Sequence, residues 1–214
     1  MTKTDQMTRA LLGELHAGLS HNQRVVLRRP RHAGVLIPII TDGDEPSVLF
    51  TRRASTLSSH RGEVAFPGGM RDEGDHDIVA TSLREAQEEI GLPPESVEVV
   101  GLLDDLITIN TDIMVTPVIG VIRSRPTWRA NPQEVARIFE IPLSELQRPD
   151  LWRQERRPWR DREISVFFFR HQGETLWGLS AHATLLMLDL LQVGAPVNLA
   201  EYQERIKMFN MSTT

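Results

Sequence analysis

The sequence predicts an α/β or α+β domain in which helices pack on a mixed β-sheet. Three observations indicate this class: β-rich runs bounded by turn residues, apolar residues at helical spacing, and the order strand, strand, helix, strands, helix along the chain. A length of 214 residues fits one domain with a sizeable core. With 40% hydrophobic and 25% charged residues, the composition is that of an ordinary globular protein.

The first expected elements are a leading helix and a pair of strands. Residues 8–19 place four leucines at helical spacing, which predicts an amphipathic helix. Residues 34–41 and 47–53 are rich in apolar and β-branched side chains, and the turn-rich stretch DGDEP joins them, so we expect two strands. A polar loop, a short strand stopped by Pro67 and its glycines, and then an acidic helix follow.

The second half of the chain is β-rich and closes with an apolar helix. Turn residues separate its apolar runs, and a hairpin is expected around Gly173. The expected elements are strands at 97–110 and 113–123, a strand and short helix at 134–146, a hairpin at 163–180 and a helix at 181–191.

Residues 148–163 carry arginines interleaved with Trp152 and Trp159, a composition that also suits single-stranded nucleic acid. The formal net charge of −5 and the acidic residues within the stretch weaken that interpretation. We therefore expect a solvated loop here, with contact to a substrate phosphate as the alternative, and no general affinity for nucleic acid or anionic membrane.

The absence of cysteine limits both redox chemistry and metal binding. Any metal has to use oxygen or histidine ligands, and a reducing compartment suits such a chain. Residues 1–20 carry scattered charges and no continuous apolar run, so they predict neither a signal peptide nor a membrane span. A cytoplasmic location is the expectation.

The acidic helix before Gly91 holds the most informative residues. Glu85, Glu88 and Glu89 share one sector near its C-terminal end, where the helix dipole disfavours negative charge. Either a hard divalent cation such as Mg²⁺ compensates them, or they form a solvated face that Arg84 partly neutralises. The apolar stripe expected on the opposite side consists of Val79, Ala80, Leu83, Ala86 and Ile90.

Both ends of this helix are marked in the sequence. Gly91 is placed to act as a left-handed C-terminal cap. Asp75 and Asp77 are alternatives for the N-terminal cap.

The stretch REAQEEIGL resembles the second half of the Nudix hydrolase motif, G-x5-E-x7-R-E-U-x-E-E-x-G-U, in which U is aliphatic. Counted from Gly69, the early acid falls on Asp75, with one residue too many before Arg84. An extra loop residue reconciles the counts and leaves Asp75 and Asp77 as alternatives for that acid. The resemblance implies an α/β/α sandwich and hydrolysis of a nucleoside diphosphate linked to another moiety. The matching positions are Arg84, Glu85, Ala86, Glu88, Glu89, Gly91 and Leu92.

The same resemblance implies the cofactor and the roles of the acids. Mg²⁺ or Mn²⁺ is the expected cofactor, with Glu85 and Glu89 as direct ligands and Glu88 as a ligand or proton acceptor. Glu134, in the loop ANPQEVAR, is the alternative general base. The catalytic candidates are Arg84, Glu85, Glu88, Glu89 and Glu134, and the metal ligands are Gly69, Glu85, Glu88 and Glu89.

Upstream, LFTRRASTLSSHRGEVAFPGG at 49–69 resembles the extended motif of the coenzyme A pyrophosphatase branch, with L-L-T-x-R, H-x-G and F-P-G-G segments. It implies cleavage of coenzyme A or acyl-coenzyme A to 3′,5′-ADP and a 4′-phosphopantetheine derivative. ADP-ribose or dinucleotide hydrolysis, and a non-catalytic nucleotide sensor, are the alternatives. Arg53 and Arg61 either bind an anionic group such as the 3′-phosphate or are surface arginines. The substrate-binding candidates are Arg53, His60, Arg61, Gly62, Phe66 and Gly68.

This likeness covers residues 35–191, most of the chain. The expected organisation is an N-terminal helical extension at 1–30, a Nudix hydrolase domain at 31–195 and a C-terminal helical tail at 196–214. A coenzyme A-like nucleoside diphosphate is the expected partner, a homodimer stays open, and neither nucleic acid nor membrane is expected.

Overall fold

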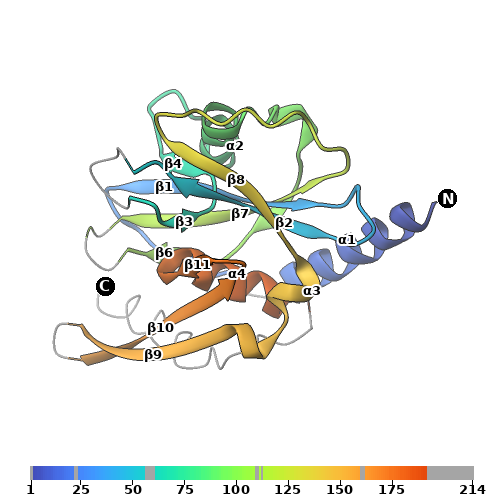
Figure 1. The fold of residues 1–214 in the computed structure, drawn as a ribbon. Coiled ribbons are helices and arrows are strands. Elements are labelled where there is room, and N and C mark those ends of the chain that lie inside the picture. Colours follow the sequence, from blue (N-terminus) through green and yellow to red (C-terminus); the bar gives the residue numbers. More distant parts are fainter. Residues whose placement is uncertain are drawn as a thin grey trace.

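Two β-sheets with helices packed around them make up the fold (Figure 1). The structure is a computed structural model that describes residues 2–21, 24–55, 61–108, 111, 113–159 and 162–191. The larger sheet contains β1 (His32–Ile40), β2 (Ser47–Arg53), β3 (Val64–Ala65), β4 (Gly68–Met70), β5 (Glu98–Leu102), β6 (Leu106–Ile107), β7 (Met114–Ile122) and β8 (Val135–Pro142). The smaller sheet contains β9 (Trp152–Trp159), β10 (Arg162–His171) and β11 (Glu174–Trp177). The helices are α1 (Lys3–His21), α2 (Ile78–Ile90), α3 (Leu143–Leu146) and α4 (Gly178–Leu190), with single 3-10 turns η1 (Pro94–Ser96) and η2 (Pro149–Leu151).

The larger sheet is mixed, as expected from the sequence. β1 and β7 pair in parallel along their whole length, whereas the other strand pairs of the described residues are antiparallel. Side chains alternate across β1, so that Leu36 and Ile40 face one core cluster while Ile37 and Ile39 face the other. The sheet is therefore buried on both faces.

Helices cover these two faces in an α/β/α arrangement (Figure 1). α2 packs on one face through Ala86 and Ile90, and α4 lies on the other together with α1. Leu15 of α1 is fully buried in the same cluster as Leu185 of α4. The helix expected as an N-terminal extension thus contributes to the main core, and the tail expected at 196–214 lies outside the described residues.

The strands β1 and β2 separate at one end, and the segment of β3 and β4 enters between them. There β2 pairs with β3, and β1 pairs with β4 so that Gly34 lies opposite Gly69. The Leu36 N–H donates to the Pro67 carbonyl at 2.9 Å, which fixes the turn between the two short strands. This insertion places Gly68 and Gly69 in the sheet beneath α2.

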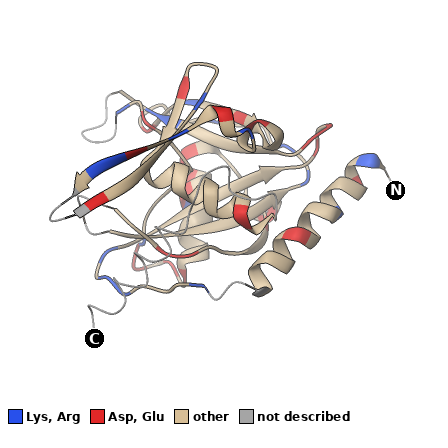
Figure 2. Cartoon of the chain, turned by 90° about the horizontal axis from the view of Figure 1, so that it is seen from below, with Lys and Arg blue, Asp and Glu red and all other residues tan. Residues whose placement is uncertain are grey.

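Residues 148–163 do not form the solvated loop expected from their charges. The described residues of this stretch form η2, β9 and the start of β10, and β9 pairs with β10 along its length. The Glu155 carboxylate pairs with the guanidinium groups of Arg153 and Arg157, so the charges of this strand are partly neutralised within the hairpin. Trp152 is buried and donates its indole N–H to the Leu146 carbonyl at 2.8 Å. Figure 2 shows basic and acidic segments succeeding one another along this hairpin.

Candidate active site

The helix α2 begins and ends at the capping residues that its sequence marks. The Asp77 carboxylate accepts the Ala80 backbone N–H at 2.8 Å, so Asp77 is the N-terminal cap. Gly91 has the left-handed conformation, with φ of 69°, and its N–H donates to the Gln87 carbonyl at 3.0 Å. These caps fix the position of the acidic residues along the helix.

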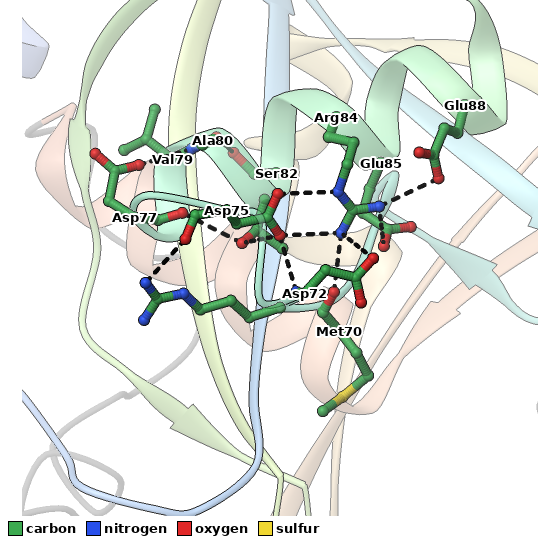
Figure 3. A network of polar contacts seen from close by, with 12 residues as sticks. Met70, Asp72, Asp75, Asp77, Val79, Ala80, Ser82, Arg84, Glu85 and Glu88 are labelled. Atoms are coloured by element: carbon green, nitrogen blue, oxygen red, sulfur yellow. Dashed lines mark hydrogen bonds and ion pairs between the residues drawn. The ribbon is translucent and has the colours of Figure 1, made fainter.

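Arg84 lies at the centre of a polar network between α2 and the loop that precedes it (Figure 3). Its guanidinium group donates to the Asp75 carboxylate at 3.0 and 3.1 Å and to the Met70 carbonyl at 3.0 Å. Its Nη1 atom lies 2.9 Å from Glu85 and 3.2 Å from Glu88. These contacts raise the pKa of Arg84 and hold that of Asp75 well below its usual range.

The two acids left open by the sequence therefore have different contacts: Asp75 is the partner of Arg84, and Asp77 is the cap of α2. Asp75 is buried and also accepts the Thr81 hydroxyl and the Asp72 N–H, each at 2.9 Å. It ties the loop to the helix through Arg84. The sequence alone could not show which of the two acids takes the early position of the motif. The loop has one extra residue, and its conformation cannot be predicted by counting.

Two glycines bring the backbone of β4 close to the helix carboxylates. A Cβ atom at Gly69 would lie 2.5 Å from the Glu85 carboxylate carbon. At Gly68, where φ is 154°, a Cβ atom would lie 2.4 Å from the Gly34 carbonyl oxygen. Only glycine fits both positions without displacing its neighbours. The Glu85 carboxylate is itself largely buried, and burial raises its pKa.

Glu89 is buried, with 3% of its surface exposed, so the expectation of one solvated carboxylate face is wrong at this position. Its carboxylate accepts the Gly68 N–H and lies 4.0 Å from a guanidinium nitrogen of Arg53. Burial, together with the charges of Glu134 and Glu85, raises the pKa of Glu89 to about 8 despite the influence of Arg53. The carboxylates of Glu85, Glu89 and Glu134 thus interact in a partly desolvated environment, and we call them the carboxylate cluster.

Glu88 is different, because its side chain is 55% exposed and faces Arg84. The solvated-face interpretation therefore holds for this one member of the triplet.

The loop before β8 closes the C-terminal end of α2. The backbone N–H groups of Arg129 and Asn131 donate to the last carbonyls of the helix, those of Ile90 and Glu89, at 2.9 and 2.8 Å. The Asn131 side chain accepts the Gln133 N–H at 3.1 Å.

The same asparagine supports the acid that follows it. The Asn131 amide donates to the Glu134 carboxylate at 3.4 Å, and the Glu134 charge acts on both Glu85 and Glu89. Asn131 was not among the residues predicted from the sequence. An asparagine that begins an N-P-Q-E turn was the available signal.

The substrate-binding candidates predicted in the segment at 49–69 lie in different environments. Arg53 lies beside the carboxylate cluster, next to Glu89. Its side chain is 27% exposed, and its Nε atom is buried. Gly62 has a left-handed φ of 68°, and Arg61 beside it is exposed. Phe66 is buried and stacks on Phe50 with a centroid distance of 4.8 Å, so it supports the glycine turn from the core. His60 lies outside the described residues.

The acids around Glu89 fit a hard divalent cation. Carboxylate oxygens are the donors that Mg²⁺ and Mn²⁺ prefer, and the cluster has more negative than positive charge. Among the residues described, no three such side chains already converge on one point as a complete metal site. The donor chemistry and the backbone approach at Gly69 nevertheless match what such an ion needs.

Comparison with known proteins assigns the chain to a family. Residues 30–163 match the NUDIX domain. The chain belongs to the Nudix hydrolase family. It is 43% identical over 163 residues to a Nudix hydrolase of Photorhabdus laumondii named NudL and described as uncharacterized, a match that covers 76% of this chain and 86% of the relative. The NudL of Pectobacterium atrosepticum is 42% identical over 158 residues, covering 72% and 80%.

Solved structures of similar proteins have lower sequence identity to this chain. A MutT/nudix family protein from Enterococcus faecalis is 16% identical, with a TM-score of 0.49 over 90% of this chain and 80% of the other. A Nudix hydrolase of M. smegmatis, RenU, is 25% identical, with a TM-score of 0.45 over 56% and 73%.

Family membership gives this Nudix hydrolase its general class, that of a pyrophosphohydrolase. No helix within the described part of the enzyme is both long and apolar enough to cross a membrane.

Proposed function

We propose that this Nudix hydrolase cleaves the diphosphate linkage of coenzyme A or acyl-coenzyme A, giving 3′,5′-ADP and a 4′-phosphopantetheine derivative. The observation that carries the hydrolytic part is the approach of Glu85 to Gly69 and of Glu89 to Gly68 in β4, with the Glu134 charge acting on both acids. The upstream segment at 49–69 carries the choice of substrate, since it matches the extended motif of the coenzyme A branch.

A diphosphate resists attack by water because its oxygens already carry negative charge. Glu85 and Glu89, with the Gly69 backbone, would hold Mg²⁺ or Mn²⁺, which supplies charge neutralisation and a more acidic water when bound. Arg84 holds the Glu85 carboxylate by its 2.9 Å ion pair, and Asp75 holds Arg84. Arg53 offers a guanidinium group beside Glu89, where an anionic substrate group needs a positive partner.

Glu134 is our candidate for the proton acceptor. It lies within electrostatic reach of both buried acids, and the Asn131 amide holds it. Glu88, the other candidate, is engaged with Arg84 and is more exposed. Glu134→Gln should then lower kcat by about two to four orders of magnitude and leave KM nearly unchanged. The same loss in Glu88→Gln and none in Glu134→Gln would reverse the assignment.

A substrate panel tests the proposal as a whole. Coenzyme A, acetyl-coenzyme A, ADP-ribose and a diadenosine polyphosphate are incubated with the protein and Mg²⁺ or Mn²⁺, and the products are separated by chromatography. We expect 3′,5′-ADP from the first two substrates, the highest kcat/KM for them, and complete loss of activity in excess chelator. A higher kcat/KM for ADP-ribose, or full activity in chelator, would contradict the proposal.

A further inference from the structure

Two arginines on neighbouring strands share one carboxylate of the smaller sheet. Arg52 of β2 and Arg137 of β8 are direct cross-strand partners. Their Nη1 atoms approach the same Glu174 oxygen, at 3.3 Å from Arg52 and 2.8 Å from Arg137. Glu174 is buried, at the start of β11. The three side chains connect the two sheets and leave this arginine pair with one more positive charge than its carboxylate neutralises.

Both guanidinium groups are open to solvent while their positions are held. The side chains of Arg52 and Arg137 are 42% and 49% exposed. The Arg137 guanidinium lies over the Phe139 ring, 5.3 Å from its centroid, which restricts its orientation. Guanidinium groups bind phosphate oxygens through paired hydrogen bonds, and two of them side by side suit a doubly charged phosphate monoester.

The arginine pair lies beside the carboxylate cluster but on the other side of β2. Successive residues of a strand point to opposite faces, so Arg53 reaches Glu89 under α2 while Arg52 reaches Glu174. A substrate with its diphosphate at Glu89 would have to pass the end of β2 for its second anionic group to meet the arginine pair. Arg53 faces the diphosphate beside Glu89, which leaves Arg52 and Arg137 on the other face as the candidates for the second group.

We infer that Arg52 and Arg137, held by Glu174, bind a phosphate monoester of the substrate, the 3′-phosphate of its adenosine part. This inference rests on the proposed function and assigns recognition of that phosphate to residues other than Arg53 and Arg61. The pair accordingly sets the preference for coenzyme A over dephospho-coenzyme A.

Direct binding gives the first test. Adenosine 3′,5′-bisphosphate and AMP are titrated by calorimetry into the wild-type protein, Arg52→Gln and Arg137→Gln, with Arg123→Gln as the matched control. Arg123 is an exposed arginine paired with Glu98, outside the site. We expect each site variant to bind the bisphosphate roughly tenfold to hundredfold more weakly, with AMP affinity changed less than threefold.

Equal losses for both nucleotides, no loss for either, or a similar loss in Arg123→Gln would overturn the inference. Inorganic phosphate is titrated in parallel, to separate a substrate phosphate from free phosphate. It should not bind at concentrations where the bisphosphate saturates. Tight binding of phosphate alone that Arg137→Gln abolishes would overturn the assignment to the substrate.

Turnover separates this inference from the proposed function. Both site variants should lose kcat/KM for coenzyme A by the same factor as their binding, with little change for dephospho-coenzyme A. If the wild-type protein cleaves both substrates and the variants lose equally on each, the function stands and the inference fails. If it cleaves neither, yet the variants still discriminate the bisphosphate from AMP, the phosphate site stands and the function fails.

Discussion

The Gly69 backbone lies directly against the Glu85 carboxylate, so closely that a Cβ atom at position 69 would lie 2.5 Å from the carboxylate carbon. The strand β4 and the helix α2 therefore approach each other where the strand carries glycine rather than a side chain. Both the metal-binding proposal and the first prediction depend on this approach.

Gly69→Ala should impair catalysis far more than folding. The methyl group displaces the end of a flexible side chain rather than backbone, so the melting temperature should fall by only a few degrees, about 1 kcal/mol. Displacement of Glu85 should lower kcat about a hundredfold. Steady-state kinetics and thermal unfolding measure the two effects.

Gly74→Ala is the matched control, because a Cβ atom at Gly74 meets nothing within 4 Å. It should keep wild-type activity and stability. An active Gly69→Ala, or an equally inactive Gly74→Ala, would show that the close approach at Gly69 is not needed for turnover.

Glu85→Gln and Glu89→Gln should each reduce kcat by orders of magnitude. Neither variant should lower the melting temperature. Above about pH 8, where Glu89 is ionised, Glu89→Gln should raise the melting temperature of the metal-free protein, since it removes a desolvated charge next to two others. Glu85→Gln should be close to neutral, because it also removes an ion pair with Arg84. Glu95→Gln, at an exposed position of η1, is the control and should change neither property. Near-normal turnover of both site variants at saturating metal would refute the assignment.

The raised pKa of Glu89 predicts how stability depends on pH in chelator. Its pKa rises from 4.5 to about 8 on folding, so the folded state binds more protons than the unfolded state between these values. The favourable contribution is fully present below the unfolded pKa and is lost as pH rises through the folded pKa. The free energy of unfolding should therefore fall, by at most about 1.4 kcal/mol per pH unit from this group, and Glu89→Gln should flatten the curve. Chemical denaturation at a series of pH values measures the slope, and an unchanged slope in the variant would contradict the prediction.

Asp75 and Asp77 should behave differently when each is replaced. Asp75→Asn removes the buried partner of Arg84 and should cost about 3 kcal/mol of stability as well as at least tenfold in kcat. Asp77→Ala removes a helix cap and should cost about 1 kcal/mol with activity retained. Denaturant unfolding measures the loss of stability in both variants, and steady-state kinetics measures their kcat. The reverse pattern would show that Asp77 is the early acid of the motif.

The sequence by itself determined the fold class and the acidic helix with its Gly91 cap, and it placed Glu85, Glu88 and Glu89 on that helix as candidates. These follow from local patterns: helical spacing of apolar residues, turn residues at strand ends, and a motif whose members lie within one helix. The same patterns predicted the strand pair and the final hairpin correctly, because apolar, β-branched runs and turn residues act over a few positions of the chain.

Only the tertiary structure decided which acids are desolvated and what lies against them. Glu88 and Glu89 are neighbours in sequence, yet one is exposed and the other is buried against Gly68 and Arg53. The charged stretch at β9 likewise became a strand because its partner lies on β10, beyond the reach of composition. Burial and charge pairing depend on segments far apart in the chain, and local propensity carries no information about which segments will meet.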